Sequence, residues 1–264
     1  MIKYLIAFLI LAASWTQGAD VVLGNTTDNI VWRSEGGNNV SARFVTGGTI
    51  TTDGTNWIHT FTSSGAFVVN GGSLVCDVLV VAGGGGGVGG VSGVNYGSGG
   101  GGGTVLAKAS YTVSSGSITV TVGDTSGAGA SGNNSAFGTN IATGGTAVAN
   151  VSRTGGANAN YIGGTASSGT DSGAGAGGGQ NGSVSTAGNG YLSSISGTAT
   201  YYAGGGGAIV SNVGISGGLG GGGAGNESGG GTSGTSNTGG GGGGGIVDTT
   251  STGGSGIVIV RYLK

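Results

Sequence analysis

The chain has 264 residues, of which 72 are glycine, none is proline and only 6% are charged. The lack of proline excludes collagen, which also needs glycine at every third position. A net charge of −2 and a mean hydropathy of +0.21 do not fit a disordered chain, which combines low hydrophobicity with high net charge. The seven Lys and Arg residues are scattered, so we expect no nucleic-acid partner.

Residues 1–19 have the pattern of a secretory signal peptide. Lys3 provides a short positive region, an apolar stretch runs from Tyr4 to Ala13, and small residues precede a cleavage point near Ala19. The apolar stretch is too short for an ordinary membrane span, so a membrane is expected as a partner only if this segment stays uncleaved. We therefore predict an extracellular or cell-surface protein.

Residues 20–82 are predicted to form an N-terminal β region, because short runs of β-branched and aromatic residues alternate with turn residues. We interpret 56–69 as a hairpin that turns at 63–65. Residues 74–82, LVCDVLVVA, are almost continuously apolar, which is typical of a strand covered on both faces. The only cysteine, Cys76, lies in this run and is expected to be a buried hydrophobic residue, since one cysteine cannot form an internal disulfide.

Residues 83–264 are predicted to form a glycine-rich domain that a C-terminal strand closes. This part contains one conventional hairpin pattern, at 104–123, and a clear apolar strand from Ile257 to Tyr262. Between them the sequence is rich in Ser, Thr, Asn and Ala, interrupted by runs of glycine. The runs lie at 83–87, 99–103, 177–179, 204–207, 220–223, 229–231 and 239–245.

The glycine runs permit two interpretations. Flexible linkers are the simpler one, because glycine has the largest backbone entropy to lose. Repeated linkers between two strand regions would have no evident purpose, however. Polyproline II helices have three residues per turn, and without side chains they can pack with their backbones almost in contact. We therefore predict a mainly β fold plus a sandwich of glycine-rich polyproline II helices, with no α-helix in the mature chain.

Three stretches carry a family resemblance: GGTITTDGTNWIHTFTSSGAFVVNGG from Gly47, CDVLVVAGGGGG from Cys76, and GGSGIVIVRY ending at Tyr262. Together they resemble a glycine-rich domain of bacteriophage tail-fibre and adhesin proteins and of environmental bacterial proteins. The resemblance implies a polyproline II sandwich whose loops recognise a host surface protein or glycan. It places those loops at about 88–98, 124–176, 180–203, 208–219, 224–238 and 246–252. A signal peptide favours a secreted or surface-displayed protein, with a virion tail tip as the alternative location.

The sequence offers no pattern for catalysis, so we predict a protein that is not an enzyme, without catalytic residues, metal or cofactor. Matches to G-x-G-x-x-G lack the strand–loop–helix context of a dinucleotide site, and no glycine run leads into a phosphate-binding loop. His59 is the only histidine. It lies on a predicted strand facing the same way as Trp57 and Phe61, which favours a packed residue over a catalytic one.

Five tyrosines in the glycine-rich part are the candidate ligand-binding residues, and all are expected in loops. Tyrosine beside Ser, Gly and Asn is typical of recognition surfaces, because its ring gives large contact area at low entropy cost. The alternative is that the rings plug the ends of the lattice or cover loop backbone. The five are Tyr96, Tyr161, Tyr191, Tyr201 and Tyr202.

These features lead to an expected function as an adhesin or receptor-recognition module, with a cell-surface protein or a glycan as partner. The alternative is a structural protein of an extracellular fibre or matrix, which would associate with copies of itself. Ice binding is a weaker alternative, since flat polyproline II lattices with rows of Thr or Ala can order water.

Overall fold

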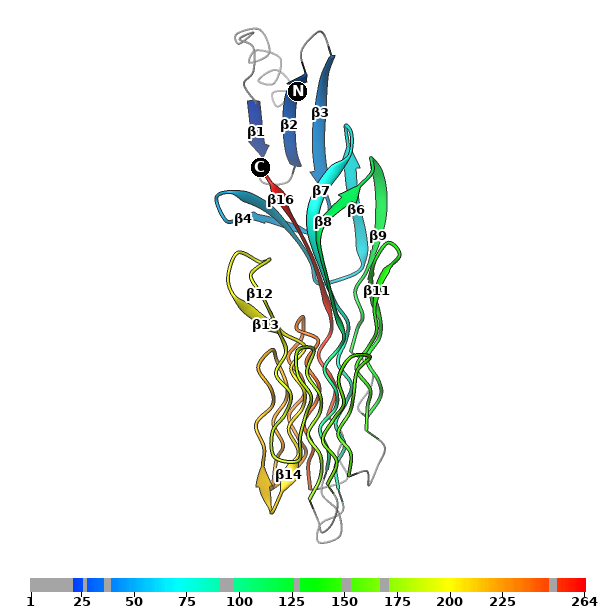
Figure 1. Ribbon diagram of the computed structural model, residues 1–264, viewed down its shortest axis with the longest axis vertical. Helices are drawn as coiled ribbons and strands as arrows, with labels where there is room; N and C mark the ends of the chain where they lie inside the picture. Colours follow the sequence, from blue (N-terminus) through cyan, green and yellow to red (C-terminus); the bar gives the residue numbers. More distant parts are fainter. Residues whose placement is uncertain are drawn as a thin grey trace.

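The computed structural model describes residues 21–25, 28–35, 39–90, 97–125, 129–148, 153–166, 171–246 and 251–264. The expected signal peptide at 1–19 lies outside these ranges. The molecule is elongated, with β-sheets towards one end and closely spaced glycine-rich segments towards the other (Figure 1). All regular elements in the described ranges are strands, which confirms the predicted mainly β fold without α-helix. Consequently, no helix in these ranges is long and apolar enough to cross a membrane.

Two antiparallel sheets form the larger end. One has seven strands in the order β1-β2-β3-β6-β9-β10-β11, and the other has five in the order β4-β5-β16-β7-β8. The seven strands are β1 (Val21–Asn25), β2 (Asp28–Glu35), β3 (Asn39–Thr46), β6 (Gly65–Asn70), β9 (Gly116–Thr121), β10 (Ser135–Phe137) and β11 (Asn140–Ala142). The five strands are β4 (Thr49–Thr52), β5 (Asn56–Phe61), β16 (Ile257–Leu263), β7 (Leu74–Val81) and β8 (Val105–Val113).

Both hairpins predicted from the sequence are wrong, because the chain crosses between the sheets at these turns. Strand β5 pairs with β4 and β16, whereas β6 pairs with β3 and β9. Similarly, β8 pairs with β7, whereas β9 pairs with β6 and β10. The turns at 62–64 and 114–115 are therefore arches. Phe61 and Phe67, on the two sides of the first arch, meet in the core with ring centroids 6.5 Å apart.

The five-stranded sheet is buried on both faces at its centre, as the apolar run at 74–82 predicted. Cys76, Val78 and Val80 of β7 face the seven-stranded sheet and join the main hydrophobic core. Leu79 and Val81 point to the opposite face and join a second apolar cluster. Strand side chains alternate between faces, so one continuous apolar run can supply both cores.

Cys76 is buried, and its thiol lies 3.5 Å from the carbonyl oxygen of Tyr111. Burial and, to a lesser extent, the neighbouring Asp77 carboxylate raise the pKa of the Cys76 thiol to about 12. The thiolate is the nucleophilic form of cysteine, so Cys76 is chemically inert at neutral pH in the folded protein. The expectation of a buried hydrophobic residue is confirmed.

The smaller end is a bundle of glycine-rich segments, which we call the glycine bundle. Strands β7, β8 and β16 connect directly to its segments (Figure 1). Two short hairpins lie within or beside it: β12 (Tyr191–Ser193) with β13 (Thr200–Tyr202), and β14 (Ile209–Val210) with β15 (Val213–Gly214). The described segments of the glycine bundle are 83–90, 97–104, 129–134, 143–148, 153–166, 171–190, 203–208, 215–226, 229–246 and 251–256.

Backbone hydrogen bonds in the glycine bundle repeat every three residues. Segment 97–104 donates to segment 239–245 at every third N–H, with N···O distances of 2.7–2.8 Å. The N–H groups in between donate, again three residues apart, to 143–146 and to 173–176. One segment is thus bonded to three neighbours on three sides, so its backbone polar groups are satisfied without a sheet.

The glycines in the bundle interior leave no room for a side chain. A Cβ on Gly100 would overlap the carbonyl oxygen of Gly85, and one on Gly206 would overlap that of Gly242. Interior neighbours therefore approach at backbone distance, which only glycine permits. The glycine content of the sequence follows from this packing.

The boundary expected between residues 82 and 83 is the point where β7 passes into the glycine bundle. It does not separate two independently packed units, because β8, β9 and β16 follow the boundary in sequence and pair with strands that precede it. The sheets are completed only by strands from both predicted regions.

His59 is a fully buried residue of β5, as its position on a predicted strand suggested. Its Nδ1–H donates to the Gly47 carbonyl oxygen at 2.7 Å, which leaves Nε2 to accept from the Tyr262 hydroxyl at 3.0 Å. The ring also packs edge-on against Phe67, with centroids 5.2 Å apart. Burial lowers the pKa of His59, and the bond to Gly47 offsets this only partly.

The low pKa of His59 predicts a specific pH dependence of stability. The folded protein holds the ring neutral, whereas the unfolded chain binds a proton below about pH 6.5. Stability is therefore full above pH 6.5 and falls as the pH drops below it, by at most about 1.4 kcal/mol per pH unit. Urea unfolding between pH 5 and 7.5 measures this above the range in which carboxylates titrate. A His59→Gln variant should lose the slope; an equally steep slope in that variant would contradict the assignment.

Candidate functional site

The strands β12 and β13 form a hairpin that stands beside the glycine bundle (Figure 1). Tyr191 pairs with Tyr202, and Leu192 pairs with Tyr201. Because neighbouring residues of a strand point to opposite faces, Tyr191 and Tyr202 share one face and Leu192 and Tyr201 share the other. The hairpin thus carries four large side chains as two cross-strand pairs, one pair on each face.

The face with Tyr202 holds the hairpin on the protein. Tyr202 is only 4% exposed and joins the second apolar cluster with Ile195 of the hairpin loop. This cluster covers the outer face of the five-stranded sheet, where it contains Ile58, Leu79 and Ile259. The prediction that Tyr202 binds a ligand is not supported by this position, since its ring is packed in the interior.

The other large side chains of the hairpin are accessible to a partner. Tyr191 is 38% exposed, Tyr201 is 37% exposed and Leu192 is 50% exposed. Monomeric soluble proteins seldom expose clustered large apolar side chains without a reason, and such clusters frequently mark interaction sites. The hairpin therefore combines a buried base with an exposed aromatic and aliphatic surface.

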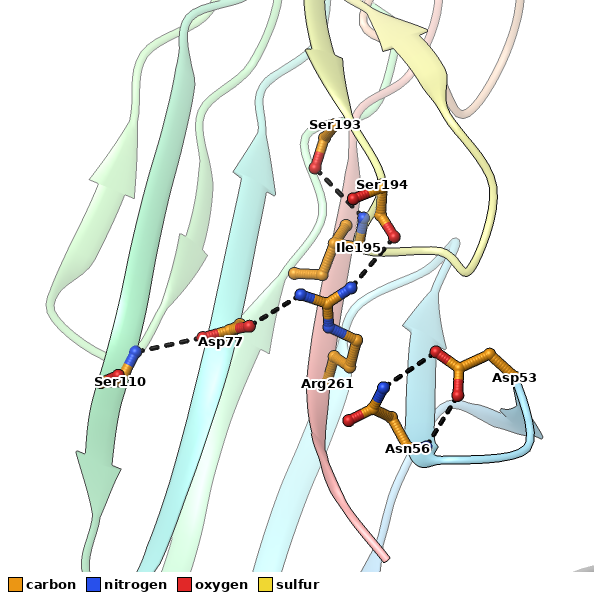
Figure 2. A network of polar contacts seen from close by, with 8 residues as sticks. All are labelled: Asp53, Asn56, Asp77, Ser110, Ser193, Ser194, Ile195 and Arg261. Carbon is orange, nitrogen blue, oxygen red and sulfur yellow. Dashed lines mark hydrogen bonds and ion pairs between the residues drawn. The ribbon is translucent and has the colours of Figure 1, made fainter.

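A polar network fixes the hairpin loop to the sheet (Figure 2). Arg261 of β16 donates from Nη1 to the Ser194 carbonyl oxygen at 3.1 Å and forms an ion pair from Nη2 to Asp77 at 2.9 Å. The second Asp77 oxygen accepts from the Ser110 backbone N–H at 3.1 Å. Residues of β7, β8, β16 and the hairpin loop are thereby connected through one guanidinium and one carboxylate.

Asp77 remains ionised in this network. Its partial burial raises the pKa, but the hydrogen bonds from Arg261 and from the Ser110 N–H outweigh burial, so the pKa of Asp77 lies below its usual value. Asp77 lies at a break in the β7–β8 register, between Cys76 and Val78. A β-bulge changes the direction of a side chain, and the side chain at this one is the Asp77 carboxylate that pairs with Arg261.

A shallow groove of about 480 Å³ lies on the surface of the glycine bundle next to the hairpin. Two segments form its walls. The first contributes Ser185, Thr186, Ala187 and Asn189, and the second contributes Gly214, Ile215, Ser216, Gly217, Gly218 and Leu219. We call it the bundle groove.

The bundle groove and the hairpin are continuous. The Leu219 N–H donates to the Asn189 side-chain oxygen at 3.0 Å, and the Gly190 N–H donates to the Leu219 carbonyl at 2.8 Å. Tyr191, the first residue of β12, follows Gly190 directly. Leu219, at this end of the groove, is 55% exposed. The aromatic hairpin and the groove therefore form one candidate binding surface.

The remaining predicted tyrosines are not part of this surface in the described ranges. Tyr161 is half-buried, and its backbone N–H donates to the Asn158 side-chain oxygen at 3.0 Å. Tyr96 lies outside the described residues. Tyr191 and Tyr201 lie on the paired strands of one hairpin instead of in the expected loops, and their side chains point to opposite faces of it.

The expected loop ranges are too broad. The range 124–176 contains β10, β11 and segments of the glycine bundle, and 180–203 contains the β12–β13 hairpin. Serine, threonine and asparagine are frequent in these segments because outer positions of the bundle have room for short side chains. Polar composition alone cannot tell such a segment from a loop.

Sequence reasoning missed Leu192 and Leu219. Each is an isolated leucine in a polar or glycine-rich stretch, and both are half exposed or more. A large apolar residue amid glycine is the available signal. It cannot be interpreted from sequence alone, because the same pattern also describes a residue that anchors the bundle to the core.

The lining of the bundle groove is uncharged. The lining of the bundle groove carries hydroxyl, amide and aliphatic groups without a charged side chain. Across the described ranges, no group of three or more His, Cys, Asp and Glu side chains is placed to hold a metal ion. The surface offers hydrogen-bond partners and apolar contact area.

The fold defines a class of protein: an all-β molecule in which a glycine bundle extends from paired antiparallel sheets. A family model described as a glycine-rich domain matches residues 60–263, and the chain belongs to this family. The resemblance noted between Gly47 and Tyr262 is thereby confirmed at the level of the glycine-rich domain. No match to the chain was found among curated proteins.

Proposed function

We propose that the protein is a non-enzymatic recognition module, an adhesin, that is secreted or displayed at a cell surface. The observation that carries this proposal is the β12–β13 hairpin, in which the Tyr202 ring is buried while Tyr191, on the same face, and Tyr201, on the other, are partly exposed. Tyrosine gives a large contact area with little side-chain entropy to lose, and a buried base reduces the cost of ordering it further. The partner is a cell-surface protein or glycan.

The glycine bundle supplies the support that such a module needs. We propose that its segments are polyproline II helices, because their hydrogen bonds and their burial both repeat every three residues. Ala142, Gly145 and Val148 are buried in one segment, whereas Thr143 and Thr146 are exposed. This pattern supports a scaffold with a packed inside and side chains only on its outer rows.

The expected signal peptide at 1–19 supports a location outside the cell. The resemblance to tail-fibre tips supports recognition of a surface, and a virion tail tip is the alternative location. Neither proposal requires a catalytic group or a cofactor, and both use the same exposed hairpin.

The test is binding of the labelled protein to a panel of bacterial cells and glycans. A Tyr191→Ala/Tyr201→Ala double variant is expected to weaken saturable binding at least tenfold, because tyrosine is enriched among the few interface residues whose truncation costs about 2 kcal/mol or more, and about 1.4 kcal/mol is tenfold. Both rings are only partly exposed, so each substitution is expected to cost about 1 kcal/mol or less of stability, and a melting curve checks that the variant is folded. Ile141→Ala, which removes an exposed apolar side chain on β11, is the control and should bind normally.

Two results would redirect the proposal. Absence of binding together with concentration-dependent assembly would favour the structural alternative, a fibre or matrix subunit. Inhibition of ice recrystallisation at low protein concentration would favour ice binding. Saturable binding that the double variant retains in full would remove the hairpin from the site.

A further inference from the structure

We propose that the bundle groove, which continues to the exposed β12–β13 hairpin, binds a segment of a neutral polysaccharide chain. This inference rests on the proposed recognition function and gives it a ligand class. The groove residues fall within the ranges 180–203 and 208–219 that the resemblance implied as loops, and the structure places them on the surface of the glycine bundle.

The walls of the groove differ from the interior of the glycine bundle in carrying side chains. Along one wall, Val213, Ser216 and Leu219 are exposed at a spacing of three residues, whereas Gly218 between them is buried. A Cβ on Gly218 would overlap the Gly188 carbonyl oxygen. The inner side of this segment thus leaves no room for a side chain at Gly218, whereas its outer side presents side chains.

This difference argues against a further glycine segment, from a second copy of the chain, as the occupant. Interior segments approach one another at backbone distance, and the side chains of Thr186, Ser216 and Leu219 prevent such an approach at the groove. The backbone donors that border it are also engaged. Gly188, Gly190 and Leu219 donate to groups of the protein at 2.8–3.0 Å.

The groups left for a ligand are mainly hydroxyls. The side-chain hydroxyls of Ser185, Thr186 and Ser216 make no hydrogen bond to any described residue of the chain. A hydroxyl both donates and accepts, so it matches the hydroxyls of a sugar, which do the same. No charged side chain lines the groove, and the charged group bonded at its edge is the Glu227 carboxylate, which accepts from the Gly214 N–H at 2.8 Å and disfavours an anionic ligand.

The length and the apolar end of the groove fit a chain of sugar units. Residues 214–219 span about 16 Å at the polyproline II rise of 3.1 Å per residue, which is room for several units. Leu219 and Tyr191 lie at the end next to the hairpin. Aliphatic and aromatic side chains can cover the C–H faces of sugar rings, while the hydroxyls along the walls hold their edges.

The experiment measures the affinity of the full chain for soluble neutral polysaccharides (a β-glucan, a mannan and a galactan), with alginate as an anionic comparison and a glycine-rich peptide as a polypeptide probe. We expect saturable binding to at least one neutral polymer and at least tenfold weaker binding to alginate and to the peptide. Ser216→Trp, which fills the groove from an exposed position, should reduce polysaccharide affinity at least tenfold.

A matched pair of variants separates the groove from the general surface. Leu219 and Val213 are both 55% exposed and lie on the same outer row, but only Leu219 lines the groove. Leu219→Ala should weaken polysaccharide binding several-fold, and Val213→Ala should leave it unchanged. Melting curves show that each variant is folded.

The outcomes distinguish this inference from the proposed function. If Ser216→Trp and Leu219→Ala bind the neutral polymers as well as the unsubstituted protein does, the groove is not the site and the inference is overturned. The same holds if alginate or the peptide binds best. If the protein binds cells, and the Tyr191→Ala/Tyr201→Ala variant does not, the recognition function stands even then. If it binds neither cells nor polymers, both proposals fail.

Discussion

Replacing Gly100 by alanine is expected to lower the free energy of unfolding by about 3 kcal/mol or more. Overpacking of a well-packed interior typically costs about 1–3 kcal/mol, and here the added methyl group meets backbone, which cannot rotate away. Gly100 donates to Gly242 at 2.7 Å and accepts from Gly206 at 2.9 Å, and its Cβ would fall on the carbonyl oxygen of Gly85. For a chain of this size the loss corresponds to a drop in melting temperature of about 6–12 °C.

The control for Gly100→Ala is Gly65→Ala. Gly65 begins β6 at an exposed position, and a Cβ there would meet only ring carbons of Phe61, at 3.9 Å. Alanine also reduces the freedom of the unfolded chain, so this variant should be neutral or slightly more stable. Thermal melts of the two variants make the comparison. Equal melting temperatures would show that crowding of the glycine bundle does not account for its glycine content.

The second large effect is expected for Phe67→Ala, at about 3–5 kcal/mol. Phe67 of β6 is fully buried between the two sheets, where its ring meets His59, Phe61 and Phe137. Removing it leaves a cavity that both sheets line, and neither sheet can close the space without breaking its own strand pairing. Urea unfolding measures the loss directly.

Phe44→Ala is the matched control for Phe67→Ala. Phe44 lies on the neighbouring strand β3 and is 36% exposed, so its removal leaves no enclosed cavity. We expect a loss of about 1 kcal/mol or less, typical of a partly exposed side chain. A loss at Phe44 as large as the loss at Phe67 would place the main core on the wrong side of this sheet.

The individual strands of the sheets could be predicted from the sequence because their signals are local. The apolar run at 74–82 predicted a strand buried on both faces, and this strand is β7. The apolar strand predicted from Ile257 to Tyr262 is present as β16. The short strands β4, β10 and β11 were missed: β4 consists of Thr and Ile beside glycine, and β10 and β11 lie in the range 124–176, which was expected to be a loop. Among the described strands β4 pairs with β5 alone, and that pairing cannot be found from local sequence pattern.

Pairing between strands could not be predicted, and the two false hairpins show why. A hairpin and an arch place similar apolar residues on either side of a short polar turn. They differ in which backbone groups bond to each other, and this depends on strands far away in the sequence. Both edges of β5 are paired, one with β4 and the other with β16, so neither edge is left for β6.

The candidate site was only partly predictable for a related reason. Composition selected Tyr191, Tyr201 and Tyr202 together, because a tyrosine in a polar stretch looks the same in the sequence whether its ring is exposed or buried. Which ring is buried depends on the alternation of the hairpin and on the apolar outer face of the five-stranded sheet. The bundle groove depends on two segments about thirty residues apart, since Asn189 bonds to Leu219 with a separation of 30.

The position of β16 sets the order in which this protein can be completed. The strand lies at the centre of the five-stranded sheet, yet it follows its neighbours β5 and β7 only after the whole glycine bundle: Tyr262 meets His59 across 203 residues, and Arg261 meets Asp77 across 184. Contacts so distant in sequence make folding slow, because a long loop must close before they form. Until residues 257–263 arrive, the middle of the sheet is an open slot with two unsatisfied strand edges. The seven-stranded sheet needs no part of β16, whereas the five-stranded sheet is completed only when β16 enters between β5 and β7 and brings Arg261 to the hairpin loop.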